Sequence, residues 1–183
     1  YKRQDEYIGV LPDAPQSFGN FLRIRIFDKV PFKNVYYLNG HATDLEEECT
    51  RYTSLLSQFP TDIVCLGIGE NGHIAFNDPD VANFNDHKLV KIVKLDHVCR
   101  QQQVNEKCFE TLEQVPTEAL TLTIPALLKA KWMFCIVPFK NKSQAVYRTI
   151  HGDISEKCPA SILRRKEKSS LYLDTESAQL LNL

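Results

Sequence analysis

The sequence predicts an α/β fold, an open, doubly wound, mostly parallel sheet with helices on both faces, as in Rossmann-like domains. Two continuous apolar runs of strand length, at residues 61–68 and 131–138, indicate strands that are buried on both faces. Amphipathic segments alternate with such runs along the chain, which is typical of helices that cover a sheet. Because 183 residues suffice for one hydrophobic core, we expect a single α/β domain over residues 1–183.

The elements of the first third follow from periodicity and capping signals. Residues 17–30 carry apolar side chains at helical spacing, and residues 34–38 form a short β-rich run that ends at an Asn-Gly turn. Thr43 is followed three residues later by Glu46, a capping box that predicts the start of a helix. The apolar run at residues 61–68 is expected in the middle of the parallel sheet.

The remaining elements continue the alternation of strands and helices. The expected strands lie at residues 89–95, 120–124, 131–138 and 170–173. The expected helices lie at residues 96–104, at Pro125 in a first helical turn, at residues 142–151 before Gly152, and at residues 160–164.

Composition and charge exclude several classes of protein. The net charge is −1, with 43% apolar and 25% charged residues, so neither a nucleic-acid nor a membrane partner is indicated. No apolar run approaches the roughly 20 residues of a membrane helix, and no signal peptide is visible. The six cysteines form no C-x-x-C pair, so we expect no zinc site but reduced thiols in a cytoplasmic protein.

The loop after the strand at residues 61–68 carries the chemistry. It contains three glycines and a polar set of Asn71, His73, Asn77 and Asp78. In open α/β sheets, ligands bind beyond the carboxyl ends of the strands. An imidazole between an amide and a carboxylate suits general acid–base catalysis, although a structural histidine in a glycine-rich turn is the alternative. The loop matches neither the phosphate loop nor, without a clear following helix, the dinucleotide fingerprint.

Residues 69–79, Gly-Glu-Asn-Gly-His-Ile-Ala-Phe-Asn-Asp-Pro, resemble the signature of glucosamine-6-phosphate deaminases, G-x-[DN]-G-H-I-[AG]-F-N-E-P. Residues 5–9, 38–40, 115–116 and 119–121 and Lys142 agree with the family in order and spacing, so the resemblance spans nearly the whole chain. It implies the doubly wound fold and the conversion of glucosamine 6-phosphate to fructose 6-phosphate and ammonia. The chain would thus be an amino-sugar-phosphate deaminase/isomerase, a hydrolase of C–N bonds in N-acetylglucosamine catabolism, needing no cofactor and no metal.

The resemblance assigns the catalytic roles residue by residue. Asp5 matches the base that moves a proton between C1 and C2, and His73 matches the acid–base that opens the sugar ring. Asn71 matches a position held by Asp or Asn, which supports the histidine. Asp78 stands where the family usually has Glu, so its carboxylate is retracted by one methylene and its reach to His73 is the open question. The substrate could therefore be glucosamine 6-phosphate or a relative such as galactosamine 6-phosphate.

The resemblance also assigns the substrate-binding residues. Lys142, beside a helix start, matches a phosphate-binding lysine, and Gly72 lies in the loop that contacts the substrate. Phe139 replaces a glycine of the family ahead of Lys142. A second basic ligand of the phosphate is expected after residue 95, and both Arg100 and Lys107 are candidates for it.

The family carries a Ser/Thr-Gly-Gly-Ser/Thr-x-Pro phosphate loop well ahead of the base that matches Asp5. This chain begins at Tyr1 without such a loop, so we expect the N-terminal part of the fold to be missing. Two alternative functions remain. One is a hydrolase like 6-phosphogluconolactonase, a family that shares the fold and a Gly-His in the same loop. The other is a catalytically impaired homologue that binds sugar phosphates, which the departures at the N-terminus, Asp78 and Phe139 favour. A homo-oligomer is a further expectation, because the family includes hexamers as well as monomers.

Overall fold

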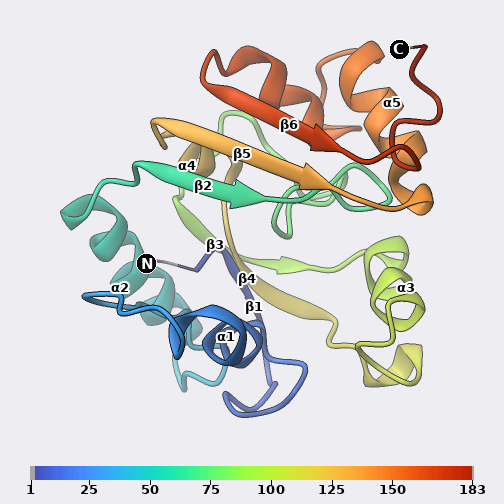
Figure 1. Ribbon diagram of the computed structural model, residues 1–183. Helices are drawn as coiled ribbons and strands as arrows, with labels where there is room; N and C mark the ends of the chain where they lie inside the picture. Colours follow the sequence, from blue (N-terminus) through green and yellow to red (C-terminus); the bar gives the residue numbers. More distant parts are fainter. Residues whose placement is uncertain (1–2, 183) are drawn as a thin grey trace.

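A computed structural model describes residues 3–182 of the chain. Its strands form two three-stranded sheets, which lie one above the other in Figure 1. The parallel sheet has the order β2 (Ile63–Leu66), β5 (Trp132–Val137) and β6 (Ser169–Leu173). The antiparallel sheet has the order β1 (Asp5–Tyr7), β4 (Glu118–Leu122) and β3 (Val90–Lys94).

The helices are mostly short and connect these strands. They are α1 (Phe18–Leu22), which continues as a π-helical turn (Arg23–Phe27), α2 (Leu45–Gln58), α3 (His97–Asn105), α4 (Ile124–Leu128) and α5 (Ser143–His151). Short 3₁₀ helices occur at Leu112–Gln114, Lys140–Lys142 and Pro159–Arg165. Within the described part of the chain, no helix has the length and apolar character needed to span a bilayer.

The predicted α/β class is confirmed, and the structure refines the arrangement of the strands. Only β2, β5 and β6 pair in parallel, whereas β4 pairs antiparallel with both β1 and β3. We expected one mostly parallel sheet, but the described residues form two three-stranded sheets, of which one is parallel and the other antiparallel. The physical reason is that periodicity identifies a strand but carries no information on the direction of its partner.

The strand β2 occupies a different place from the one predicted. We expected it in the middle of the sheet, but among residues 3–182 it pairs with β5 alone, and β5 is the central strand. Its side chains alternate, so that Val64 and Leu66 are buried while Ile63 is 55% exposed. A continuous apolar run therefore did not mean burial on both faces.

Two predicted boundaries also change. The N-cap of α2 is Asp44, not Thr43, because its carboxylate accepts a hydrogen bond of 2.9 Å from the backbone N–H of Glu47. Residues 34–38 form no strand in the described structure. There the carbonyl of Tyr36 accepts a 3.3 Å hydrogen bond from the N–H of Arg3. Local sequence does not reveal this contact, because its two partners lie more than thirty residues apart.

The buried side chains form two clusters. The larger one is built from residues of both sheets and of helices α2, α4 and α5. The smaller one gathers around Tyr7 of β1, whose ring stacks on Phe18 at 4.9 Å and meets Phe76 at 5.2 Å and Phe109 at 5.6 Å between centroids. This aromatic cluster fixes β1 against the polar loop that follows β2, because Phe76 belongs to that loop.

Candidate active site

Hydrogen bonds tie the loop after β2 to the antiparallel sheet. The N–H of Phe76 donates to the hydroxyl of Thr121 at 3.0 Å, and the amide of Asn77 donates to the carbonyl of Leu122 at 2.9 Å. Thr121 is in turn the register partner of Asp5 across β1 and β4. The loop at the end of one sheet and the first strand of the other sheet thus meet at one place.

The imidazole of His73 is held from one side by two oxygens. Its Nδ1 lies 2.8 Å from Oδ1 of Asn71 and 2.9 Å from Oδ1 of Asp78. The amide nitrogen of Asn71 donates to Asp78 at 3.0 Å and to Asp96 at 2.7 Å, which fixes the amide with its oxygen toward the histidine. Because both neighbours of Nδ1 are acceptors, Nδ1 carries the proton of the neutral ring and Nε2 keeps its lone pair.

Asp78 is fully buried and yet remains a carboxylate. Burial by itself raises the pKa of this group, but hydrogen bonds from His73, from Asn71 and from the N–H of Asp96 hold the pKa below its ordinary value. The one-methylene retraction therefore does not break the contact with the histidine. This answers the question of reach that the replacement of the family's Glu had raised.

Asp5 presents the second carboxylate of the site. Its side chain is 20% exposed, and its Oδ1 lies 3.2 Å from a guanidinium nitrogen of Arg3. Burial raises the pKa of Asp5, the charge of Arg3 opposes this rise, and that of Glu6 adds to it. His73 is close enough for its charge to act on the same carboxyl group. A carboxylate with a raised pKa accepts a proton more readily than an ordinary one.

Two glycines shape the loop around the histidine. The backbone of Gly69 packs directly against the imidazole of His73. The three atoms nearest to a Cβ built at this glycine all belong to that ring. Gly72 has a φ of +92°, and a Cβ there would lie 2.8 Å from the sulfur of Cys158. The N–H of Gly72 donates to the carbonyl of Gly69 and its own carbonyl accepts from Ala160. Its predicted contact with substrate stays a prediction.

Lys142 is buried at the end of the 3₁₀ helix before α5. Its ammonium donates at 3.0 Å to Oε1 of Glu106, which also accepts from Gln102 at 2.8 Å. The carboxylate of Glu106 therefore lies beside Lys142, at the place where the sequence predicts the phosphate group of the substrate. Arg100 is one of the two other candidates for phosphate binding. Its guanidinium donates to the backbone carbonyls of Leu112 and Val115 and so holds the 3₁₀ turn at residues 112–115.

The backbone ahead of Lys142 is strained. Phe139 has a φ of +79° and a ψ of 147°, a region that only glycine adopts freely, and its side chain is 63% exposed. The residue that replaces the family's glycine, noted in the sequence, thus adopts a backbone conformation that favours glycine.

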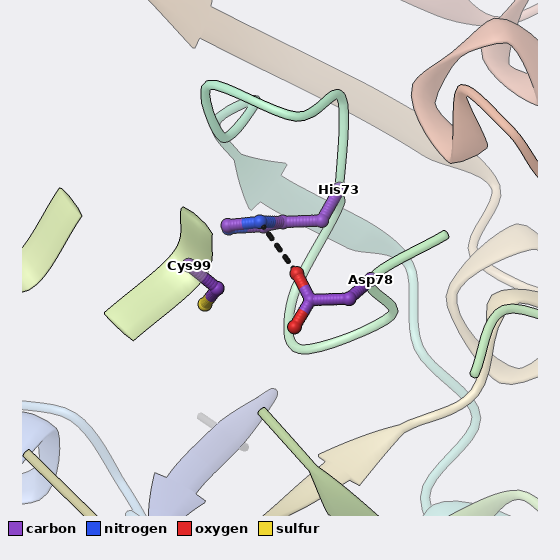
Figure 2. A group of neighbouring side chains, drawn as sticks. All are labelled: His73, Asp78 and Cys99. Carbon is purple, nitrogen blue, oxygen red and sulfur yellow. Dashed lines mark ion pairs between the residues drawn. The ribbon is translucent and has the colours of Figure 1, made fainter. Parts of the chain in front are cut away.

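Sequence reasoning missed three residues of the site, all contributed by α3 or its ends. Asp96 caps α3 through the N–H of Cys99 at 2.6 Å and also receives the amide of Asn71. Cys99 lies beside His73 and Asp78 (Figure 2), and the ligand atoms of the three side chains lie within 4.8 Å of one another. The third is Glu106. The helix-capping pattern could have located Asp96, whereas no local signal marks the other two.

The chain resembles known proteins along most of its length. A family model for glucosamine-6-phosphate isomerases and 6-phosphogluconolactonases matches residues 5–172. A glucosamine-6-phosphate deaminase of Bacillus cereus strain B4264 is 41% identical over 176 residues, which are 96% of this chain and 65% of that protein. A glucosamine-6-phosphate deaminase of Listeria innocua is 40% identical over 97% of this chain and 74% of its own length. The chain thus spans less than two thirds of the length of the Bacillus relative.

Solved structures agree with this likeness. A structure described as a monomeric glucosamine-6-phosphate deaminase superposes with a TM-score of 0.90 at 35% identity, covering 98% of this chain and 73% of that one. A 6-phosphogluconolactonase from Thermotoga maritima superposes with a TM-score of 0.71 at 21% identity, covering 94% of this chain and 70% of that one. The second likeness concerns the fold alone.

Proposed function

This chain belongs to the family of glucosamine-6-phosphate isomerases and 6-phosphogluconolactonases, and we propose that it converts glucosamine 6-phosphate and water to fructose 6-phosphate and ammonia. The observation that carries the proposal is the clamp on His73, in which Asn71 and Asp78 both accept from Nδ1 at 2.8 and 2.9 Å. The relatives at 40–41% identity are deaminases, which supports this reaction over other members of the family.

Ring opening is the step for which the clamp is suited. With Nδ1 protonated toward Asp78, the opposite nitrogen Nε2 is free to take the proton of the C1 hydroxyl and to return a proton at the ring oxygen. When the ring of His73 becomes imidazolium, the adjacent carboxylate of Asp78 stabilises the added charge. The full burial of Asp78 strengthens this interaction, because little water screens it.

Proton transfer between C1 and C2 falls to Asp5. The carboxylate removes the proton at C2, and the C1 carbonyl oxygen gains the proton that the C2 ammonium loses, which gives an enolamine. The same carboxylic acid then returns its proton at C1, and water hydrolyses the resulting iminium at C2 to the ketone and ammonia. The elevated pKa of Asp5, caused by burial, brings its basicity closer to the working range of a general base. Arg3 holds the carboxylate through Oδ1, which leaves the second oxygen to face a substrate.

A 6-phosphogluconolactonase is the second candidate, and a specific feature separates the two. Deamination needs a base for the carbon-bound proton in addition to the histidine, whereas hydrolysis of a lactone needs only activation of water. The chain offers that additional base in Asp5, whose charge interacts with that of His73. A protein that binds sugar phosphates without turnover is the third candidate, and the assay below separates all three.

Incubation with glucosamine 6-phosphate and measurement of the released ammonia test the proposal. His73→Ala and Asp5→Asn should each lower the release by about 10² to 10⁴-fold. The matched control is His87→Ala, since the side chain of His87 is exposed. Hydrolysis of 6-phosphogluconolactone without ammonia release would favour the second candidate, and binding without either reaction would favour the third.

The remaining expectations are proposals of the same kind. We propose that residues 1–183 act as a single domain and that the protein is cytoplasmic, supported by six free thiols. Galactosamine 6-phosphate as a competing substrate separates the two amino sugars in the same assay. Light scattering distinguishes a homo-oligomer from the monomer expected by analogy with the relative described as monomeric.

A further inference from the structure

The site contains a thiol that the proposed reaction does not use. Cys99 on α3 is fully buried. Its sulfur, a ring nitrogen of His73 and a carboxylate oxygen of Asp78 all lie within 4.8 Å of one another (Figure 2). The three side chains approach from different directions, two from the loop after β2 and one from the helix. A thiol, an imidazole and a carboxylate are together a donor set that zinc prefers.

The charges around this cluster favour a cation. The carboxylates of Asp78, Asp96 and Asp5 all act electrostatically on the thiol of Cys99. The guanidinium of Arg3 lies beside Asp5 and hydrogen-bonds to it, so part of this negative charge is offset. A divalent ion bound by one thiolate, one carboxylate and one neutral imidazole would form a group without net charge, which suits a buried place.

The distances allow coordination after a small adjustment. With metal–sulfur and metal–nitrogen bonds of about 2.3 and 2.0 Å, neighbouring ligand atoms on a tetrahedral ion lie about 3.5 Å apart. Nδ1 of His73 and Oδ1 of Asp78 already lie 2.9 Å apart. The sulfur of Cys99 must therefore approach by about 1 Å, which rotation of one short side chain can supply.

We propose that His73, Asp78 and Cys99 form a binding site for a thiophilic divalent cation such as Zn²⁺, and that the bound ion blocks the acid–base function of the histidine. On binding, the thiol of Cys99 loses its proton to solvent and the thiolate sulfur forms a bond to the ion. Nδ1 of His73 gives its lone pair to the ion, so that the proton of the neutral ring must sit on Nε2. The nitrogen that faces the sugar then has no lone pair to accept a proton.

The same site discriminates between metals. Magnesium and calcium prefer oxygen ligands only and do not displace the proton of a thiol. Because the thiol of Cys99 is fully buried within the cluster, the site favours an ion that bonds strongly to sulfur. The ion is therefore an inhibitor of the proposed reaction and takes no part in it as a cofactor.

Titration with Co²⁺ tests the site without reference to activity, because a cobalt–thiolate bond gives a charge-transfer band in the near ultraviolet. The protein carrying Cys65→Ser and Cys108→Ser should show the band at one ion per chain, since these replacements remove the two exposed thiols. Adding Cys99→Ser should abolish the band and weaken binding by at least about a hundredfold, as loss of a direct ligand exceeds the effect of its supporting residues. Circular dichroism verifies that each variant is folded.

Two results overturn the proposal. One is a band that persists after Cys99→Ser, and the other is the absence of any band in the variant that lacks only Cys65 and Cys108. If Cys99→Ser does not fold, His73→Gln serves instead and should shift the band and weaken cobalt binding. The effect on catalysis rests on the proposed function: Zn²⁺ should suppress ammonia release and EDTA should restore it. A protein that binds Co²⁺ through Cys99 but never releases ammonia refutes the function and leaves the metal site intact.

Discussion

The contact between Gly69 and His73 gives the sharpest test of the site. In Gly69→Ala, the new methyl group would lie inside the van der Waals surface of the imidazole, and all three nearest atoms belong to that ring. The nearest ring atom, Cε1 of His73, would lie far closer to the new Cβ than the roughly 3.5 Å at which carbon atoms pack, so the ring must retreat by more than about 1 Å. That movement breaks or lengthens the contacts of Nδ1 with Asn71 and Asp78, now 2.8 and 2.9 Å.

The expected loss can be estimated from this displacement. A misplacement of about 1 Å at a reacting group lowers the rate by about 100-fold, which corresponds to about 2.7 kcal/mol of activation free energy. The free energy of unfolding should fall by no more than about 2 kcal/mol, because the lost hydrogen bond is partly offset by the lower entropy of the unfolded alanine chain. The loss in activation free energy should thus exceed the loss in the free energy of unfolding.

The assay is steady-state ammonia release from glucosamine 6-phosphate, with urea unfolding measured on the same samples. Gly67→Ala is the matched control in the same loop, because a Cβ there would meet only the carbonyl of Ile136 at an ordinary 3.4 Å. It should keep its activity within about threefold, a change of less than 1 kcal/mol in the activation free energy. Equal activity of Gly69→Ala and Gly67→Ala would refute the claim that the position of His73 limits the reaction.

Three further predictions follow from single contacts. Asp5→Asn should lower ammonia release by about 10² to 10⁴-fold and yet raise the urea midpoint at about pH 7. Burial raises the pKa of Asp5 above its ordinary 3.8, so the ionised form destabilises the fold. The contribution of Asp5 to stability is complete below the pKa of the unfolded chain and is lost as the pH rises through the pKa of the folded protein. The wild type and Asp5→Asn should therefore unfold alike at about pH 3. A larger difference at that pH would contradict the raised pKa of Asp5. Phe139→Gly should raise the free energy of unfolding by about 1 kcal/mol by relieving the φ of +79°, whereas Phe139→Ala keeps a Cβ at the same φ and should show no such gain in urea unfolding. Glu106→Gln should lower the KM for the sugar phosphate by up to about fivefold at constant kcat, because the half-exposed partner no longer competes with phosphate for Lys142, and an unchanged or higher KM would speak against a phosphate role for this lysine.

The local features of the chain could be predicted from the sequence because each depends on neighbouring residues. The loop after β2 places Asn71, His73 and Asp78 within eight positions, so their meeting needs only a turn, which the glycines supply. The caps of α3 and α4 at Asp96 and Thr123 follow from single side chains that bond to N–H groups three residues on. The strands β3 to β6 appeared near their predicted positions for the same reason.

Pairing between distant segments was the part that the sequence left open. The pattern of β2 showed an apolar strand, but only the structure shows that, within residues 3–182, it pairs with β5 alone and leaves Ile63 exposed. The short strand β1 has three residues and no periodicity, and it forms because β4 offers an edge on which Asp5 meets Thr121. Strand direction depends on the path of long connections, which carry no local signal.

The sequence by itself determined the family, the α/β class and the imidazole with its two supporting side chains, because these are encoded in one continuous segment. Only the tertiary structure decided what surrounds that segment: Asp96 on the amide of Asn71, Cys99 near the carboxylate of Asp78, and Glu106 on Lys142. These contacts join residues 21 to 36 positions apart. Their geometry depends on where α3 packs. Many side chains from distant parts of the chain contribute to the free energy of that packing, so no short sequence motif encodes it.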